Sequence, residues 1–123
     1  MATSGINAYP TGPTSGGKIY AFNNVSTSPE VVAPANVNRQ SITFHNPGAV
    51  NIYVAPVNVQ ALNSVSGTIT NQVLTPSNVA LGGCFIVGAG GGFITLTGEC
   101  QGSYQAFSAT GSGNALTVSD NNV

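Results

Sequence analysis

The residues best suited to chemistry in this sequence are two cysteines, one histidine and a glycine-rich run. Cys84 and Cys100 flank the run GAGGG at residues 88–92. Such loops bind phosphate when they open a helix and, in the P-loop, carry a lysine. Here only Gly88 and Gly90 fit the dinucleotide pattern, no lysine follows, and FITLTG after the run alternates as a strand does. We therefore predict a turn between two strands, with glycine required by its backbone, and no phosphate site.

The cysteines and the histidine are also too few for a metal site. A structural zinc ion takes four ligands, and the chain offers Cys84, Cys100 and His45. We therefore predict no metal and no other cofactor. The two cysteines should lie near the two ends of the glycine-rich hairpin, where a disulfide is geometrically conceivable. Because we find no secretory signal, we expect a reducing compartment and interpret both as buried free thiols.

The residues that nucleophilic catalysis requires are also few. A nucleophilic mechanism needs a Ser or Cys, a His and an orienting carboxylate. The carboxylates of this chain are Glu30, Glu99 and Asp120, and nothing in the sequence brings any of them to His45 or to one another. We predict no catalytic residues and no enzymatic activity, and a small hydrolase using His45 is the least favoured function.

Charge is unusually rare and unevenly placed. Charged residues make up 4% of the 123 residues and the net charge is −1, against about 25% in an ordinary domain. No charged residue lies between Arg39 and Glu99. A nearly neutral chain cannot release counter-ions from DNA or RNA, so we exclude nucleic acid as a direct partner. It also has weak repulsion between copies, which favours a permanent assembly.

No membrane or export segment is expected. Residues 79–97 are uncharged and long enough to suggest a membrane helix, but they are rich in glycine and lack flanking Lys or Arg. The N-terminus has neither a basic nor an apolar region of the kind found in signal peptides. We expect synthesis in the cytoplasm.

Short alternating runs bounded by Gly, Pro, Asn and Ser recur along the chain. They predict an all-β fold, an antiparallel β-sandwich or jelly roll of about eight short strands, with almost no helix. The expected strands are residues 18–22, 30–33, 39–46, 51–55, 57–62, 67–74, 80–87, 93–98, 103–109 and 115–119.

The run RQSITFHN at residues 39–46 shows the clearest alternation. It places Gln40, Ile42 and Phe44 on one face of a half-buried strand. The other face carries Arg39, Ser41, Thr43 and His45.

Two turns are expected to join neighbouring antiparallel strands. Asn46-Pro47-Gly48-Ala49 has Pro and Gly at the central positions of a type II turn, so residues 39–45 and 51–55 should pair. The segment TGSGN at residues 110–114 should likewise join 103–109 to 115–119.

The first 17 residues differ from the rest. They are rich in Gly, Pro, Ser and Thr, and we expect an extended N-terminal arm at 1–17 and a single β-sandwich domain at 18–123. Its apolar residues Ile6 and Tyr9, together with Pro10, are the predicted partner-binding residues.

The stretches RQSITFHNPGAVNIYV, GGFITLTGECQGSYQAFS and ALTVSDNNV resemble small virion proteins of tailed bacteriophages, above all the head decoration, or cement, proteins. The resemblance covers roughly residues 39–55 and 92–123 and not the middle of the chain. It implies a β-sandwich or jelly roll that forms a homo-oligomer, a dimer or trimer, on the exterior of the capsid. It also implies that the major capsid protein is the partner and that no enzymatic residue is present.

The sequence thus favours a structural virion protein that binds the outer surface of a phage capsid and stabilises the head by bridging capsid subunits. The alternative is a carbohydrate-binding or host-attachment β-sandwich module of a phage tail or spike. In that alternative the sugar-stacking residues would be Tyr9, Tyr20, Tyr53 and Tyr104.

Overall fold

The structure, a computed structural model, describes residues 18–79, 82–98 and 100–122. The arm and its residues Ile6, Tyr9 and Pro10 lie outside the described residues. The strands are β2 (Lys18–Val25), β3 (Glu30–Ala33), β4 (Arg39–Asn46), β5 (Ile52–Pro56), β6 (Gln60–Leu62), β7 (Ile69–Asn71), β8 (Phe85–Val87), β9 (Gly92–Thr97), β10 (Tyr104–Ser108) and β11 (Asn114–Asn122). Each segment expected to form a strand overlaps one, which confirms the all-β prediction.

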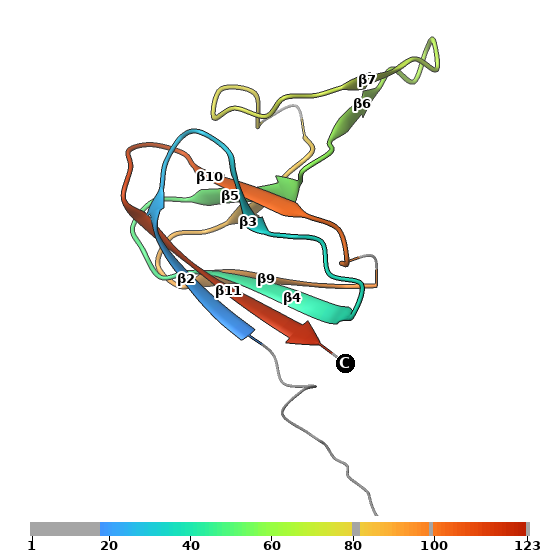
Figure 1. Ribbon diagram of the computed structural model, residues 1–123. Helices are drawn as coiled ribbons and strands as arrows, with labels where there is room; N and C mark the ends of the chain where they lie inside the picture. Colours follow the sequence, from blue (N-terminus) through green and yellow to red (C-terminus); the bar gives the residue numbers. More distant parts are fainter. Residues whose placement is uncertain (1–17, 80–81, 99, 123) are drawn as a thin grey trace, which may run out of the picture.

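Two four-stranded antiparallel sheets pack face to face (Figure 1). The strand order is β2-β11-β4-β9 in one sheet and β3-β10-β5-β8 in the other, and β6-β7 form a separate two-stranded sheet. Within each of the pairs β2/β3, β4/β5, β8/β9 and β10/β11, the chain passes from one sheet to the other. This alternation is the connectivity of an eight-stranded jelly roll, so the predicted sandwich is confirmed.

The main core lies between the two sheets. Ile42 and Phe44 of β4 are fully buried, as their alternation predicted, and face β5 and β10 across the sandwich. The rings of Phe44 and Tyr104 lie 5.6 Å apart between centroids and are tilted by 56°, a favourable edge-to-face type of contact between the sheets. The other buried members are Val25, Val32, Ala33, Ile52, Val54, Val87, Cys100, Ala106, Leu116 and Val118.

The pairing predicted for the tight turns is wrong. Residues 39–46 and 52–56 belong to opposite sheets, as do β10 and β11, so neither pair is a hairpin. The same holds for β8 and β9 on either side of the glycine-rich run. These connections are arches between sheets, and they lie at one end of the sandwich, at the left of Figure 1. A turn residue reverses the chain but does not decide which sheet the next strand joins.

The first arch is held by a side chain and not by a type II turn. Gly48 does not have the positive φ that this turn requires. Instead, Gly48 N donates to Asn46 Oδ1 over 3.0 Å, while Asn46 Nδ2 donates to the carbonyls of Val50 and Val87 over 2.7 and 2.9 Å. Asn46 is completely buried, and its amide therefore joins two arches.

The segment between β5 and β8 forms an insertion, defined here as residues 57–84. Part of it covers the outer face of the sheet β3-β10-β5-β8, where Leu74 is buried against Ala55 and Phe107. Val59, Val79 and Cys84 pack at the edge of this second cluster. The rest, the hairpin β6–β7, projects away from the sandwich (Figure 1). The sequence predicted strands here but not that the insertion would cover one sheet.

The position predicted for Arg39 is also wrong. Arg39 is 1% exposed, whereas the alternation placed it on the solvent face and placed the exposed Gln40 on the buried face. In the pairing of β4 with β11, Arg39 lies opposite Asn122 and Ser41 opposite Asn121, so Gln40 is an extra residue. This bulge turns Arg39 to the interior, because each inserted residue reverses the alternation of faces.

Candidate functional site

The glycine-rich run does not form an anion site. Its backbone N–H groups are already bonded within the arches: Ala89 N to Asn51 Oδ1 (2.9 Å), Gly90 N to Gly48 O (2.7 Å), Gly91 N to Asn46 O (2.8 Å) and Gly92 N to Gly88 O (3.0 Å). Phosphate binding requires free N–H groups at a helix N-terminus or nest. The run joins β8 to β9, which confirms the predicted connection between strands.

Glycine is required in this run for two different reasons. Gly90 and Gly91 have φ values of 78° and 103°, which residues with a Cβ seldom adopt. At Gly92 the reason is space, because a Cβ would lie 2.4 Å from the carbonyl oxygen of Gly88. Close approach of two backbone segments therefore explains this part of the sequence.

Both cysteines are free. Cys100 is completely buried, and its Sγ lies 3.7 Å from the carbonyl oxygen of Arg39, to which it donates. Cys84 is half-buried, and burial raises the pKa of its thiol. A thiol with a raised pKa is a poor nucleophile at neutral pH, so Cys84 acts as an apolar side chain within the cluster around Phe107.

His45 is not brought to a carboxylate. It lies half-buried on the outer face of β4, between Thr117 of β11 and Phe93 of β9. Asp120 is on the inner face of the same sheet, bonded to Arg39, and Glu30 begins β3 in the other sheet. Glu99 lies outside the described residues. Within the described part of the chain, no group of three or more His, Cys, Asp or Glu could hold a metal ion.

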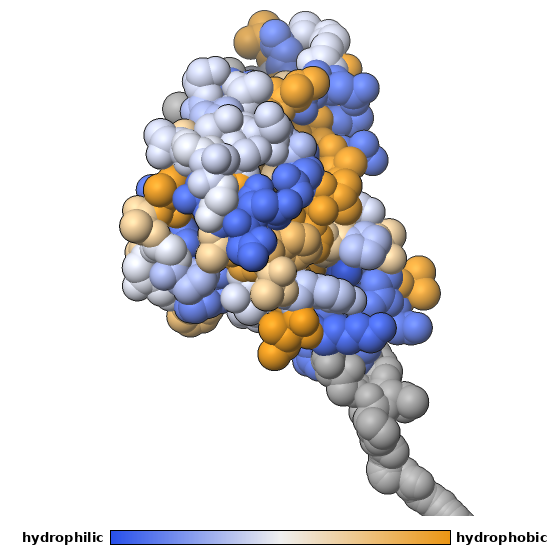
Figure 2. Space-filling model, turned by 60° about the vertical axis from the view of Figure 1, so that its left-hand side comes forward, coloured by the Kyte–Doolittle hydropathy of each residue, from blue (hydrophilic) through white to orange (hydrophobic). Residues whose placement is uncertain are grey.

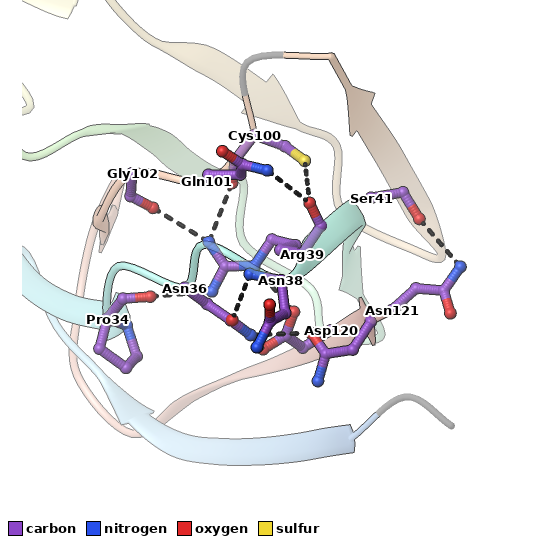
Figure 3. A network of polar contacts seen from close by, with 11 residues as sticks. Pro34, Asn36, Asn38, Arg39, Ser41, Cys100, Gln101, Gly102, Asp120 and Asn121 are labelled. Atoms are coloured by element: carbon purple, nitrogen blue, oxygen red, sulfur yellow. Dashed lines mark hydrogen bonds and ion pairs between the residues drawn. The ribbon is translucent and has the colours of Figure 1, made fainter. Parts of the chain in front are cut away.

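The polar cluster that sequence reasoning missed surrounds Arg39 (Figure 3). Arg39 Nε donates to Asp120 Oδ1 over 2.8 Å, and the two side chains are 0% and 7% exposed. Its other nitrogens donate to the carbonyl oxygens of Cys100 (2.9 Å), Gly102 (3.0 Å) and Pro34 (2.8 Å). Asn36 Nδ2 donates to Asp120 Oδ2 (3.3 Å) and Asn122 Oδ1 (2.8 Å).

This arrangement serves the fold, because four of the five N–H donors of the Arg39 guanidinium are bonded within the protein. The guanidinium ties β4 to β11 and to the segments that precede β4 and β10. Asp120 balances the charge of Arg39, which removes most of the cost of burying both. The sequence carried no local signal that distinguishes Arg39 and Asp120 from the exposed Lys18 and Glu30, which also lie in strands.

The outer face of β2-β11-β4-β9, which no other described strand covers, is rich in hydroxyl groups on β4, β9 and β11, and we call that part the hydroxyl face. The strand register sets Thr43 opposite Ser119 and Thr95, and Ser41 opposite Thr97. Thr43 Oγ1 and Thr95 Oγ1 are 2.8 Å apart and hydrogen-bonded. The members of the face on β4, β9 and β11 are Ser41, Thr43, His45, Phe93, Thr95, Thr97, Thr117, Ser119 and Asn121. None of these residues is an Asp, Glu, Lys or Arg, so this part of the face is uncharged.

Several large apolar residues are exposed on the insertion, and others, among them Ile19, Val37 and Phe93, are exposed on the sandwich. Val65 is 97% exposed and Val73 78%, and Leu62 and Ile69 of the hairpin are also exposed. Apolar residues reach the surface in the upper part of the molecule in Figure 2, where the insertion projects. A shallow hollow of about 450 Å³ also lies on the hairpin, lined by Ala61, Leu62, Asn63, Ser66, Thr68 and Thr70. No lining residue is titratable, so the hollow offers no acid–base chemistry.

The three described tyrosines do not form a sugar-stacking surface together. Tyr104 is buried in the main core, and Tyr53 lies half-buried with its ring centroid 5.3 Å from that of Phe107. Tyr20 is 37% exposed on β2, and Tyr9 lies outside the described residues.

No protein-family model, curated protein or solved structure matches this chain. Across residues 18–79, 82–98 and 100–122, the structure has no helix long and apolar enough to cross a membrane.

Proposed function

We propose that this protein is a structural component of a virion that binds the outer surface of a phage capsid and stabilises the head by bridging capsid subunits. The observation that carries the proposal is where the polar side chains of the described residues lie. Arg39, Asp120 and Asn46 are buried as supports of the fold. What reaches the surface is an uncharged hydroxyl face and exposed apolar side chains, which suit contact with other proteins.

The fold supports the same class of function by analogy. Jelly rolls recur in viral capsid proteins and in lectins, although a fold by itself does not assign a function. Between these two classes the tyrosines favour the first, because Tyr53 and Tyr104 are turned into the clusters of the fold. Among the described tyrosines, only Tyr20 therefore remains as a sugar-stacking residue for the carbohydrate-binding alternative.

The proposed partner is the major capsid protein, and binding takes place through several modest contacts. Residues of the arm, Ile6, Tyr9 and Pro10, provide one contact and the hydroxyl face another. Individually weak contacts held on one oligomer gain avidity, by about 10²–10⁴ when the geometry allows simultaneous binding. The host synthesises the protein in its cytoplasm, and it acts on the exterior of the virion.

The first test compares particles assembled with and without this protein. We expect heated particles that lack it to release their DNA at a lower temperature, as measured with a DNA-binding dye. Imaging of intact particles should show added density on the outside of the capsid. Equal thermal release, or absence of the protein from purified particles, would refute the proposal.

A second test locates the contacts. Deletion of residues 1–17 removes none of the described strands, so the sandwich should remain folded while binding to particles weakens. Thr43→Lys and Thr95→Lys, made together, place charge on the hydroxyl face and should weaken binding in the same assay. Val37→Lys replaces an exposed residue in the segment before β4, outside both the hydroxyl face and the hairpin, and serves as the control, with binding to particles unchanged.

A further inference from the structure

The hairpin β6–β7 has a surface that the isolated chain leaves unpaired. Its strands are three residues long and stand off the sandwich (Figure 1). Leu62 lies directly opposite Ile69, which sets both side chains on one face of the hairpin. They are 64% and 59% exposed, and Val65 at the tip is 97% exposed. We call Leu62, Val65 and Ile69 the hairpin patch.

The tip is nevertheless well ordered by its own hydrogen bonds. Asn63 Oδ1 accepts from Val65 N (3.0 Å) and Ser66 N (3.1 Å), and Gly67 N donates to Asn63 O over 2.7 Å. Gly67 has a φ of 74°, which closes the turn. The hairpin therefore presents Val65 in a fixed position and is preorganised for contact.

The rest of the molecule does not need the hairpin patch. The insertion is anchored to the sandwich by Leu74, Val59 and Val79, which pack on Ala55 and Phe107. Leu62, Val65 and Ile69 belong to neither buried cluster. The packing of the fold gives no reason for these side chains to be exposed. Exposed apolar groups of this kind mark interaction surfaces.

The sequence also lacks the usual protection of a free strand edge. Natural proteins place Lys, Pro or a bulge on exposed edges to prevent pairing. Residues 57–75, which contain both strands, have no charged residue and no proline. A lone two-stranded hairpin is at best marginally stable in water, whereas three or more strands with an apolar face are stable. The hairpin is thus built to be completed by another surface.

We propose that the hairpin patch packs on the same patch of a second copy of this chain, forming a two-fold symmetric dimer. The hairpin carries no charge, so a charged partner would lose hydration at this surface without gaining an ion pair, whereas a second hairpin is equally uncharged. The net charge of −1 opposes the approach of two copies only weakly. Two hairpins packed face to face remove the apolar side chains of both from water, and a two-fold axis closes the assembly without exposing a further patch.

The direct test is the mass of the isolated full-length chain in solution by sedimentation or light scattering. We expect a dimer for the unaltered chain and a monomer for the Leu62→Lys, Ile69→Lys double variant. Val37→Lys replaces a residue that is 80% exposed in the segment before β4, and this control should remain a dimer. A monomer for the unaltered chain at every concentration, or a dimer unaffected by the double variant, would overturn the proposal.

A second measurement keeps the test independent of how well the double variant folds. In the variant Leu62→Cys, a short bis-maleimide should join two chains, because this position lies in the dimer interface. Thr70→Cys, on the opposite face of the hairpin, should give far less cross-linked dimer on the same background of native cysteines. Equal cross-linking at both positions would contradict the proposed face. Neither experiment contains capsids, so the result is separate from the test of the proposed function.

Discussion

Arg39 and Asp120 form an ion pair inside a protein that has almost no other charges. Nε of Arg39 lies 2.8 Å from Oδ1 of Asp120, and β4 and β11, which carry them, are neighbours in one sheet. The remaining donors of the guanidinium reach main-chain carbonyls of two other segments. The pair closes the end of the sandwich opposite the arches.

Removing one partner of this pair should destabilise the fold strongly. We expect Asp120→Ala to lower the free energy of unfolding by about 3–5 kcal/mol, since it leaves the Arg39 cation buried without its counter-charge. Urea denaturation followed by circular dichroism measures this loss. Glu30→Ala removes an exposed carboxylate and should leave the midpoint unchanged. A loss for Asp120→Ala no larger than for Glu30→Ala would contradict the structural role of the pair.

A methyl group should be tolerated at one end of the glycine-rich run and not at the other. In Gly92→Ala the new Cβ meets the backbone of Gly88 at 2.4 Å, so the arch must shift. Overpacking of this kind costs about 1–3 kcal/mol. Gly88→Ala meets nothing within 4 Å and should change stability little. Thermal unfolding of the two variants side by side checks the difference, and equal melting temperatures would count against it.

The buried amide of Asn46 gives a prediction with a defined pH dependence. Its Nδ2 donates to the carbonyl oxygens of Val50 and Val87, so Asn46→Asp sets a carboxylate against two acceptors. Burial and these oxygens would raise the pKa of the new carboxyl in the folded state, because the protonated form can donate one bond. Stability of the variant should therefore increase as the pH falls from neutral toward the acid range.

The control for this prediction is Asn46→Ala, which loses the same two donated bonds and also the bond accepted from Gly48 N, and which has no titrating group. Both variants should be less stable than the unaltered chain at neutral pH, by about 1–3 kcal/mol for each carbonyl left without a donor. Only Asn46→Asp should recover on acidification relative to Asn46→Ala, as measured by urea midpoints. Parallel pH profiles for the two variants would exclude the proposed geometry.

The two cysteines should differ in reactivity. Cys100 is completely buried and should react with a thiol reagent only on unfolding, whereas the half-buried Cys84 should react slowly in the folded state.

Burial raises the pKa of Cys84 and is also the main cause of the raised pKa of Tyr104. The folded chain therefore holds these protons at pH values where the unfolded chain has lost them.

Because the pKa values of Cys84 and Tyr104 are raised by folding, the stability of the protein depends on pH in the alkaline range. Stability should be constant near neutral pH and should fall as the pH rises above the ordinary pKa of a thiol and then of a phenol. Urea midpoints at neutral and alkaline pH measure the fall, and Cys84→Ser should reduce it. A chain whose stability increases with alkaline pH would contradict the burial of these groups.

Local patterns in the sequence predicted the elements well and their partners poorly. Period-two alternation found β4 because Ile42 and Phe44 pack into the core. The bulge at Gln40 escaped detection because it depends on the register with β11, far along the chain. Pro47 and Gly48 indicated a reversal, but the buried Asn46 decides that the reversal crosses between sheets.

The features of the candidate surfaces also divide into those that the sequence predicted and those that only the structure shows. Low charge and the lack of catalytic sets were visible in the composition. The exposure of the hairpin patch was not visible in the sequence, because Leu62 and Ile69 have the residue types of an ordinary half-buried strand. Only the packing of Leu74 on Phe107 shows which part of the insertion is covered. The role of Arg39 likewise required the three-dimensional contacts.

The strand order also constrains when the chain can fold during its synthesis. β10 lies between β3 and β5, and β11 lies between β2 and β4, so one inner position of each sheet is filled from residues 104–122, and β2 and β3 have no other neighbour in their sheets. A nascent chain that has emerged only as far as β9 contains strands that have no neighbours to pair with. The jelly roll therefore assembles after this last stretch has left the ribosome, and its earlier, uncharged strands must stay apart from those of other nascent chains until then.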